Sequence, residues 1–220
     1  MPPEAAPTEW EHARRLLDQG LVKLGLDLPS ASREQLMALL HLLAQWNRSF
    51  NLTALRTPAD MVTGHLLDSL AVLAHLPPGR LLDVGTGAGF PGLPLAIARP
   101  DTAHVLLDSN LKKTRFVQHA ALTLDLRNVE VVQQRAEQYR PDPPFPVVIA
   151  RAFAPLPRLL PLIGHLCAPG GRLLALKGPA VETELADLPA SFEHVDTLTL
   201  PAVTGRDRRT LVVLARRAVG

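Results

Sequence analysis

The chain has 220 residues, of which 47% are hydrophobic, 20% charged and only 4% aromatic. This length and composition fit one α/β domain, alone or with a helical extension, and exclude collagen, a disulfide scaffold and an intrinsically disordered chain. The single cysteine, Cys167, excludes an internal disulfide and a cysteine metal cluster. The longest stretch without Asp, Glu, Lys or Arg spans residues 84–98, shorter than the roughly 20 apolar residues of a membrane helix. We see no signal peptide and expect a cytoplasmic protein.

Charge differs between the two parts of the chain. Residues 1–79 carry 6 basic and 8 acidic residues, whereas residues 80–220 carry 17 and 13. The basic excess therefore lies in the C-terminal two thirds. It permits a local basic face but does not prove nucleic-acid binding.

The first 79 residues show the periodicity of helices, with apolar side chains at three- and four-residue steps. Ser30 or Ser32 can cap the second of these helices. The pattern predicts helices at residues 9–24, from about residue 30 to residue 46, and at residues 60–75, with a turn at residues 47–51.

From residue 80 on, short apolar runs alternate with apolar helical stretches, which is typical of βαβ units and a parallel sheet buried on both faces. Two later runs, joined by a basic loop that contains glycine, predict an antiparallel pair at the sheet edge. The predicted strands are residues 80–84, 105–108, 129–132, 146–150, 172–177, 192–200 and 210–216, and the predicted helices are residues 90–98, 111–124 and 156–167.

A glycine-rich loop follows the first predicted strand and contains Asp83, Gly85, Gly87 and Gly89. Glycines let the backbone approach a ligand, and ligands bind such sheets at the carboxyl ends of the strands. A dinucleotide fingerprint would need glycine where Phe90 stands, and a P-loop would need a Gly-Lys-Ser/Thr sequence. The loop resembles the Asp-x-Gly-x-Gly-x-Gly loop of S-adenosylmethionine-dependent methyltransferases with a Rossmann-like sheet.

Further polar residues follow the next two strands. Asp108 ends the second strand, and its carboxylate can accept hydrogen bonds from both hydroxyls of a ribose. Adenosylmethionine and NAD both carry such a ribose, so Asp108 alone does not separate them. Ala136 and Glu137 lie after the third strand, where a polar side chain and a backbone amide could bind adenine. Asp108 and Glu137 could instead merely cap the following helices, but the preceding glycine loop favours cofactor binding.

Several segments together resemble one family, the bacterial 16S rRNA guanine-N7 methyltransferases, also called glucose-inhibited division protein B. These segments are residues 46–54, 65–69, 83–97, 106–116, 150–156 and 173–178. The resemblance implies an α/β, Rossmann-like methyltransferase domain at residues 80–220, with a mostly parallel sheet and an antiparallel edge strand, preceded by an N-terminal helical extension at residues 1–79. It implies S-adenosyl-L-methionine as cofactor, 16S rRNA or the small ribosomal subunit as partner, and methyl transfer to N7 of guanine 527. We also expect a monomer.

The resemblance assigns cofactor-binding positions within these segments. Family positions fall on Gly85, Phe90, Ala136, Glu137 and Arg151. The wider superfamily pattern adds Asp83, Gly87, Gly89 and Asp108.

The end of the fourth strand bears on catalysis. Methyltransferases that act on exocyclic amines often carry an Asn/Asp-Pro-Pro-aromatic motif there, and this chain lacks it. N7 of guanine has a free lone pair and no hydrogen, so it can attack the methyl group without a general base, unlike a hydroxyl acceptor. Arg151 and Phe153 are the candidate catalytic residues. Arg151 could bind the methionine carboxylate or an RNA phosphate, and Phe153 could stack on the target base or belong to the core.

Basic residues in three places could follow an RNA backbone, although short charge runs are usually solvated surface. The histidines show no metal-ligand spacing, so we expect no metal. The candidate RNA-binding residues are Lys112, Lys113, Arg115, Lys177, Arg206, Arg208 and Arg209.

Three alternative functions remain open at this point. One is a methyltransferase with a non-RNA acceptor, and another is a non-catalytic RNA-binding protein that retains a cofactor pocket. An NAD-dependent dehydrogenase is the least favoured, because Phe90 replaces the third fingerprint glycine.

Overall fold

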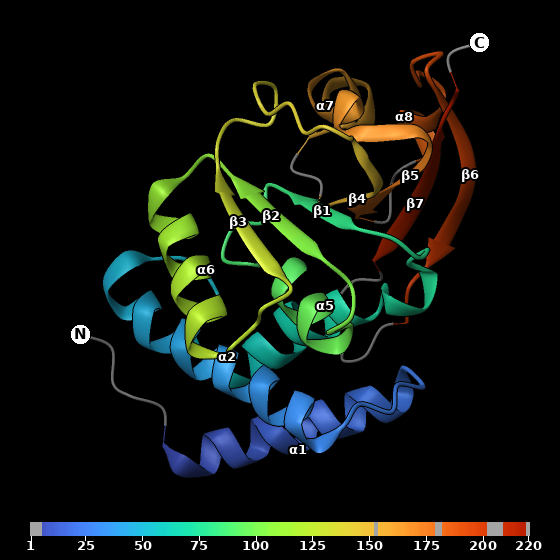
Figure 1. The fold of residues 1–220 in the computed structure, drawn as a ribbon. Coiled ribbons are helices and arrows are strands. Elements are labelled where there is room, and N and C mark those ends of the chain that lie inside the picture. Colours follow the sequence, from blue (N-terminus) through green and yellow to red (C-terminus); the bar gives the residue numbers. More distant parts are fainter. Residues whose placement is uncertain (1–5, 152–153, 179–181, 202–208, 219–220) are drawn as a thin grey trace.

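A seven-stranded sheet forms the centre of the protein, in the order β3-β2-β1-β4-β5-β7-β6 (Figure 1). The computed structural model describes residues 6–151, 154–178, 182–201 and 209–218. The strands β1 to β5 pair in parallel, whereas β7 is antiparallel to both β5 and β6, which confirms the antiparallel edge. The strands are β1 (Leu81–Val84), β2 (His104–Asp108), β3 (Val129–Gln133), β4 (Phe145–Arg151), β5 (Cys167–Lys177), β6 (Phe192–Thr199) and β7 (Thr210–Arg216).

Helices precede the sheet and connect its strands. The N-terminal ones are α1 (Pro7–Lys23), α2 (Ser30–Phe50), α3 (Pro58–Met61), the π-helix η1 (Val62–Leu67), α4 (Asp68–Leu70) and the 3-10 helix η2 (Leu73–His75). The later ones are α5 (Gly92–Ala98), α6 (Leu111–Thr123), α7 (Leu156–Ile163), the 3-10 helix η3 (Gly164–Leu166) and α8 (Glu182–Leu185).

Three boundaries differ from the sequence-based prediction. Residues 47–51 are not a turn, because α2 continues to Phe50 and ends at Asn51, which has a left-handed backbone (φ 50°). Residues 60–75 form several short helices rather than one. The helix predicted at 156–167 ends at Ile163, because residues 164–166 tighten into a 3-10 turn and Cys167 already pairs with Phe145 of β4.

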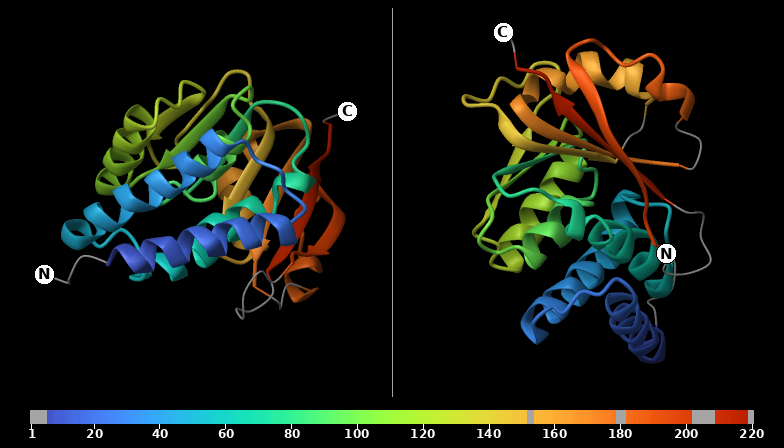
Figure 2. Two further views of the ribbon diagram at one scale, coloured as in Figure 1. Left: turned by 90° about the horizontal axis from the view of Figure 1, so that it is seen from below. Right: turned by 90° about the vertical axis from the view of Figure 1, so that its right-hand side faces the viewer.

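Alternation along the strands divides the core between the two faces of the sheet. Val148 and Ala150 of β4 pack with α7 on one face, while Val147 and Ile149 point to the other. That second face is covered by α5 and α6 and, outside them, by α1 and α2 (Figure 2). The neighbouring strands β2, β1 and β4 are parallel, so their carboxyl ends lie together at one edge of the sheet. Open α/β sheets bind their ligands at this edge.

The N-terminal helices share their core with the sheet domain. One apolar cluster runs from Ala13 of α1 through Leu40 of α2 to Phe116 of α6, all fully buried. It therefore crosses residue 79, and the division into residues 1–79 and 80–220 remains a prediction.

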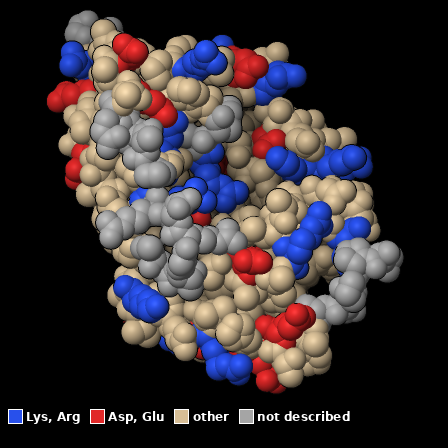
Figure 3. Space-filling view, turned by 180° about the vertical axis from the view of Figure 1, so that it is seen from behind, with Lys and Arg blue, Asp and Glu red and all other residues tan. Residues whose placement is uncertain are grey.

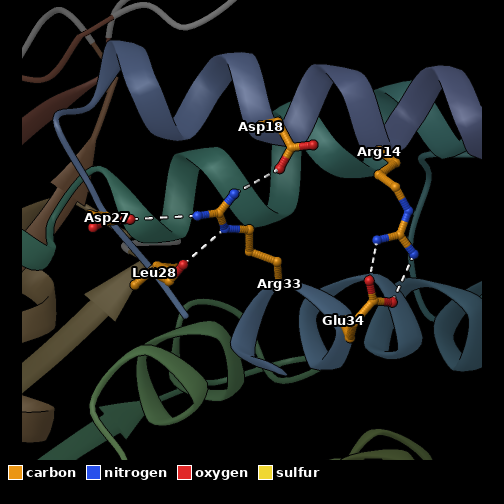
Figure 4. Close-up of polar contacts among 6 residues, drawn as sticks. All are labelled: Arg14, Asp18, Asp27, Leu28, Arg33 and Glu34. Carbon is orange, nitrogen blue, oxygen red and sulfur yellow. Dashed lines mark hydrogen bonds and ion pairs between the residues drawn. The ribbon is translucent and has the colours of Figure 1, made fainter. Parts of the chain in front are cut away.

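Polar contacts also join α1 to α2, as Figure 4 shows. Arg14 of α1 donates to both carboxylate oxygens of Glu34, at 2.5 and 2.8 Å, and Arg33 of α2 lies 3.7 Å from the carboxylate of Asp18 in α1. Because the Arg14 and Glu34 side chains are about half exposed, such a pair contributes little stability, typically below about 1 kcal/mol. Apolar burial is thus the main force holding α1 in place.

Within the described ranges, none of the helices has the length and apolar character that crossing a membrane requires.

Candidate functional site

The glycine loop lies directly after β1, as predicted. Gly85, Gly87 and Gly89 have φ values of 69°, 63° and 86°, a left-handed conformation that favours glycine. The amides of Gly85 and Thr86 donate to the carbonyl of Leu107 on β2, at 2.8 and 3.1 Å. The loop is therefore tied to the neighbouring strand before it turns toward α5.

The side chain of Asp83 fixes the glycine loop by hydrogen bonds. Its carboxylate is fully buried, and its Oδ2 accepts hydrogen bonds from the Thr86 hydroxyl at 2.6 Å and the Gly92 amide at 2.8 Å. The other oxygen, Oδ1, is also buried and has no hydrogen-bond partner among the described residues. A buried carboxylate oxygen without a donor is costly, so this atom fits a donor group brought by a ligand.

The environment of Asp83 changes its acidity. Burial raises the pKa of Asp83 to about 6, although hydrogen bonds from Thr86 and Gly92 and the positive charge of Arg151 lower it. Because Asp83 is completely buried, this carboxylate carries its charge at neutral pH only at a cost in folding free energy.

Asp108 joins the glycine loop to the start of α6. Its Oδ2 accepts from the amide of Gly87 at 2.9 Å, and its Oδ1 accepts from the amide of Asn110 at 2.8 Å. The cap of α6 is Asn110, whose side chain accepts from the amides of Lys112 and Lys113. Asp108 is therefore not the helix cap, and each carboxylate oxygen keeps a lone pair for a further donor.

Arg151 ends β4 on the same sheet face as Asp83. Burial lowers the pKa of its guanidinium, while the carboxylates of Asp83 and Asp68 raise it. Asp68 in turn pairs with Arg209, the residue before β7, at 3.1 Å. The structure thus assembles two acidic and two basic side chains from four distant parts of the chain.

Phe90 belongs to the core rather than to an open pocket wall. Its side chain is only 1% exposed and stacks on the ring of His65, with centroids 4.4 Å apart. His65 also contacts the hydroxyl of Thr53 at 2.8 Å through Nε2. Phe90 can therefore contribute its backbone to a cofactor site, while its side chain anchors the glycine loop to the N-terminal helices.

There is room for a small group next to Gly87. A Cβ built on Gly87 would meet nothing nearer than 4.0 Å, where it would find the Gly85 carbonyl oxygen and the Lys113 ammonium. Lys113, predicted to bind RNA, is therefore directed toward the glycine loop. Ala136 is half-buried and Glu137 is exposed in the turn after β3, where Glu137 lies 3.9 Å from Arg135.

The remaining basic candidates fall in different environments. Lys112 and Arg115 are exposed on the first turns of α6. Lys177, expected at the ligand edge, is only 8% exposed and pairs with Glu184 at 2.7 Å, so its ammonium is not presented to solvent. Arg206, Arg208 and the catalytic candidate Phe153 lie outside the described residues.

Several contacts of this site were missed by sequence reasoning. Thr86 and Asn110 are local, and their position within a turn before a helix could have indicated their hydrogen bonds. Asp68 and Glu184 contact residues 141 and 7 positions away, and no sequence pattern pairs them. No group of three His, Cys, Asp or Glu within the described ranges could hold a metal ion.

Replacing Asp83 with Asn should change how stability depends on pH. The pKa of Asp83 is about 6 in the folded state, whereas an ordinary aspartate has a pKa of 3.8. Asp83 therefore makes stability fall as pH rises through this window and become constant above it. Relative to Asp83→Asn, the unaltered protein should lose roughly 2 kcal/mol of unfolding free energy between pH 4 and pH 7. Denaturant unfolding at several pH values measures this, with exposed Asp101→Asn as control. Parallel profiles for the unaltered protein and Asp83→Asn would contradict the assignment.

Comparisons with solved structures agree with the fold. A methyltransferase from Aquifex aeolicus, described as dependent on S-adenosylmethionine, is 20% identical with a TM-score of 0.54, covering 71% of this chain and 93% of its own. A glycopeptide N-methyltransferase in complex with S-adenosyl-L-methionine is 12% identical with a TM-score of 0.57, covering 69% and 94%. These similarities establish the Rossmann-like methyltransferase fold.

Sequence comparisons establish the family. The family model for rRNA small subunit methyltransferase G matches residues 32–212. A protein of that name from Nitrosococcus oceani is 47% identical over 205 residues, which cover 93% of this chain and 96% of the relative. Membership of a methyltransferase family also confirms the expected cofactor, S-adenosyl-L-methionine. The chain belongs to the rRNA small subunit methyltransferase G family.

Proposed function

We propose that this protein transfers the methyl group of S-adenosyl-L-methionine to N7 of guanine 527 in 16S rRNA. Methylation of rRNA follows from the family, and its relative from Nitrosococcus oceani carries the name of an rRNA small subunit methyltransferase. The choice of N7 rests on the chemistry available at the carboxyl edge of the sheet.

The observation that carries the proposal is the state of the acid–base groups at this edge. Asp83 is buried beneath the loop, Asp108 holds two backbone amides, and Asp68 is paired with Arg209. These three carboxylates are therefore each held by at least one contact within the fold. Such groups are poorly suited to remove a proton from an acceptor.

An N7 acceptor has no proton to remove. Its lone pair forms the bond to the methyl carbon while the carbon–sulfur bond breaks, and the sulfur keeps the electron pair. The guanine becomes cationic and the cofactor a neutral thioether. Catalysis then depends on in-line positioning of nucleophile, methyl and sulfur rather than on a general base.

The cofactor supplies the activated methyl group. We assign its ribose to the Asp108 carboxylate and its adenine to the turn with Ala136 and Glu137. Gly85, Gly87 and Gly89 would let the backbone of the loop approach the cofactor closely. The buried Oδ1 of Asp83 without a donor and the room next to Gly87 support this placement. Arg151, half-buried on the same sheet face as Asp83, is assigned to the methionine carboxylate, where a guanidinium binds well.

RNA would approach over the same edge. Figure 3 shows Lys and Arg side chains around a hollow near the middle of the face opposite that of Figure 1. We assign backbone contacts to the exposed Lys112 and Arg115, together with Arg206 and Arg208, and leave Lys177 out because it is buried. Reaching N7 requires the guanine to be unstacked or to lie in an unpaired loop.

Replacing Asp108 with Ala should weaken cofactor binding at least tenfold. The change removes the proposed acceptor of the ribose hydroxyls and the bond to the Gly87 amide, and hydrogen bonds to a charged group contribute about 1.5–3 kcal/mol each. Calorimetric titration with S-adenosylhomocysteine measures the affinity, and Asp101→Ala is the control. Asp108→Asn, which keeps one oxygen, should lose less. Equal affinity of Asp108→Ala and the unaltered protein would exclude the ribose assignment.

Replacing Lys112 and Arg115 together with Ala should weaken binding of RNA and leave S-adenosylhomocysteine affinity unchanged. Two fewer phosphate contacts should reduce the slope of log affinity against log salt by roughly 1.5. Filter binding of the target rRNA segment over a salt series measures this. The control variant carries Arg15→Ala and Arg127→Ala, both exposed. If both double variants behave alike, this part of α6 does not contact the RNA.

The function itself is tested with small ribosomal subunits from a strain that lacks the modification. After incubation with the protein and labelled S-adenosylmethionine, the RNA is digested and the methylated nucleoside is identified by mass spectrometry. We expect 7-methylguanosine at one position. A different methylated nucleoside would overturn the N7 assignment. Cofactor binding without RNA methylation would indicate a non-RNA acceptor or a non-catalytic RNA-binding protein.

A further inference from the structure

A buried ion pair lies beyond the carboxyl ends of β4 and β5. The Nζ of Lys177, the last residue of β5, is 2.7 Å from Oε2 of Glu184 in α8. Their side chains are only 7% and 19% exposed. Neither residue has a place in cofactor or RNA binding as assigned above.

Both ends of this pair also hold the segment that follows β4. Lys177 donates to the carbonyl of Ala154 at 2.7 Å, and Glu184 accepts from the amide of Leu156 at 2.7 Å. The N-cap residue of α7 is Pro155, whose side chain makes no capping hydrogen bond. Glu184 of α8 instead accepts a hydrogen bond from the first amide of α7 and so acts as its cap. The pair therefore holds residues 154 and 156, three and five positions after Arg151.

The pair acts from the sheet face opposite the cofactor-binding residues. Alternation along β5 places Lys177 with Leu173 and Ala175, which pack with α7, whereas Arg151 shares its face with Asp83 and Asp68. Loss of the pair should therefore move residues 154–156 at the start of α7 while leaving the glycine loop unchanged.

Stability alone does not account for such a pair. Removing two charges from water is costly, and well-packed uncharged replacements of buried pairs are often neutral or stabilising. What the pair supplies is geometry, since it holds a carbonyl and an amide two residues apart. These residues follow Arg151, which the proposed function assigns to the methionine carboxylate of the cofactor.

We propose that Lys177 and Glu184 are positioning residues that hold residues 154–156, at the start of α7, as a wall of the site for the acceptor base. This inference rests on the proposed function. A displacement of about 1 Å at such a site can cost about a hundredfold in rate. The methyl-transfer rate should therefore depend on the pair more strongly than cofactor affinity or overall stability does.

The test uses the double variant Lys177→Met/Glu184→Gln, which removes both charges but keeps an acceptor for the Leu156 amide. We expect a denaturation midpoint close to that of the unaltered protein and S-adenosylhomocysteine affinity within about twofold. The single-turnover rate of rRNA methylation should fall by about ten- to a hundredfold. Glu34→Gln, which alters the exposed pair with Arg14 far from this edge, should keep the full rate. An unchanged rate in the folded double variant would overturn the proposal.

Glu184→Asp provides a second variant should the double variant fail to fold. It keeps the charge but is one methylene shorter, so the contact with the Leu156 amide should weaken. Hydrogen exchange at that amide should become faster, together with a lower methylation rate. Faster exchange with an unchanged rate would overturn the positioning role. Failure of the proposed function would appear differently, as no 7-methylguanosine from the unaltered protein.

Discussion

The buried carboxylate of Asp83 is the interaction on which the site depends. It lies near the end of β1 and accepts hydrogen bonds from Thr86 and Gly92, which lie on either side of Gly87 and Gly89 of the glycine loop. A charge in this position is costly, and burial raises its pKa to about 6. In return, the hydrogen bonds to Asp83 fix the conformation of the glycine loop before a ligand binds.

The two faces of the sheet near this carboxylate carry different sets of polar contacts. On one face, Asp83, Arg151, Asp68 and Arg209 place charges of alternating sign beside the glycine loop. On the other, Lys177 and Glu184 engage the backbone after β4. In our proposal the first face binds the cofactor and the second shapes the acceptor site.

The N-terminal helices are part of the site's support. His65 of η1 stacks on Phe90 of the glycine loop and contacts Thr53. Thr53 is positioned in turn by Asn47, which binds its backbone amide and carbonyl at 2.9 and 3.0 Å from inside α2. This explains why a polar asparagine is buried in α2, and why the segments around residues 47–54 and 65–69 accompany the glycine loop.

The sequence by itself determined the alternation of strands and helices and the antiparallel edge of the sheet. It also placed the glycine loop after β1 and Asp108 at the end of β2, because apolar periodicity and glycine placement are local signals. It also predicted the rRNA methyltransferase family. Only the tertiary structure decided that Phe90 is core, that Lys113 is directed toward the glycine loop, and that Lys177 is buried against Glu184 rather than free for RNA. The pairing of Asp68 with Arg209 was likewise beyond the sequence. These roles depend on which side chains meet across distant elements, and local patterns carry no information about that.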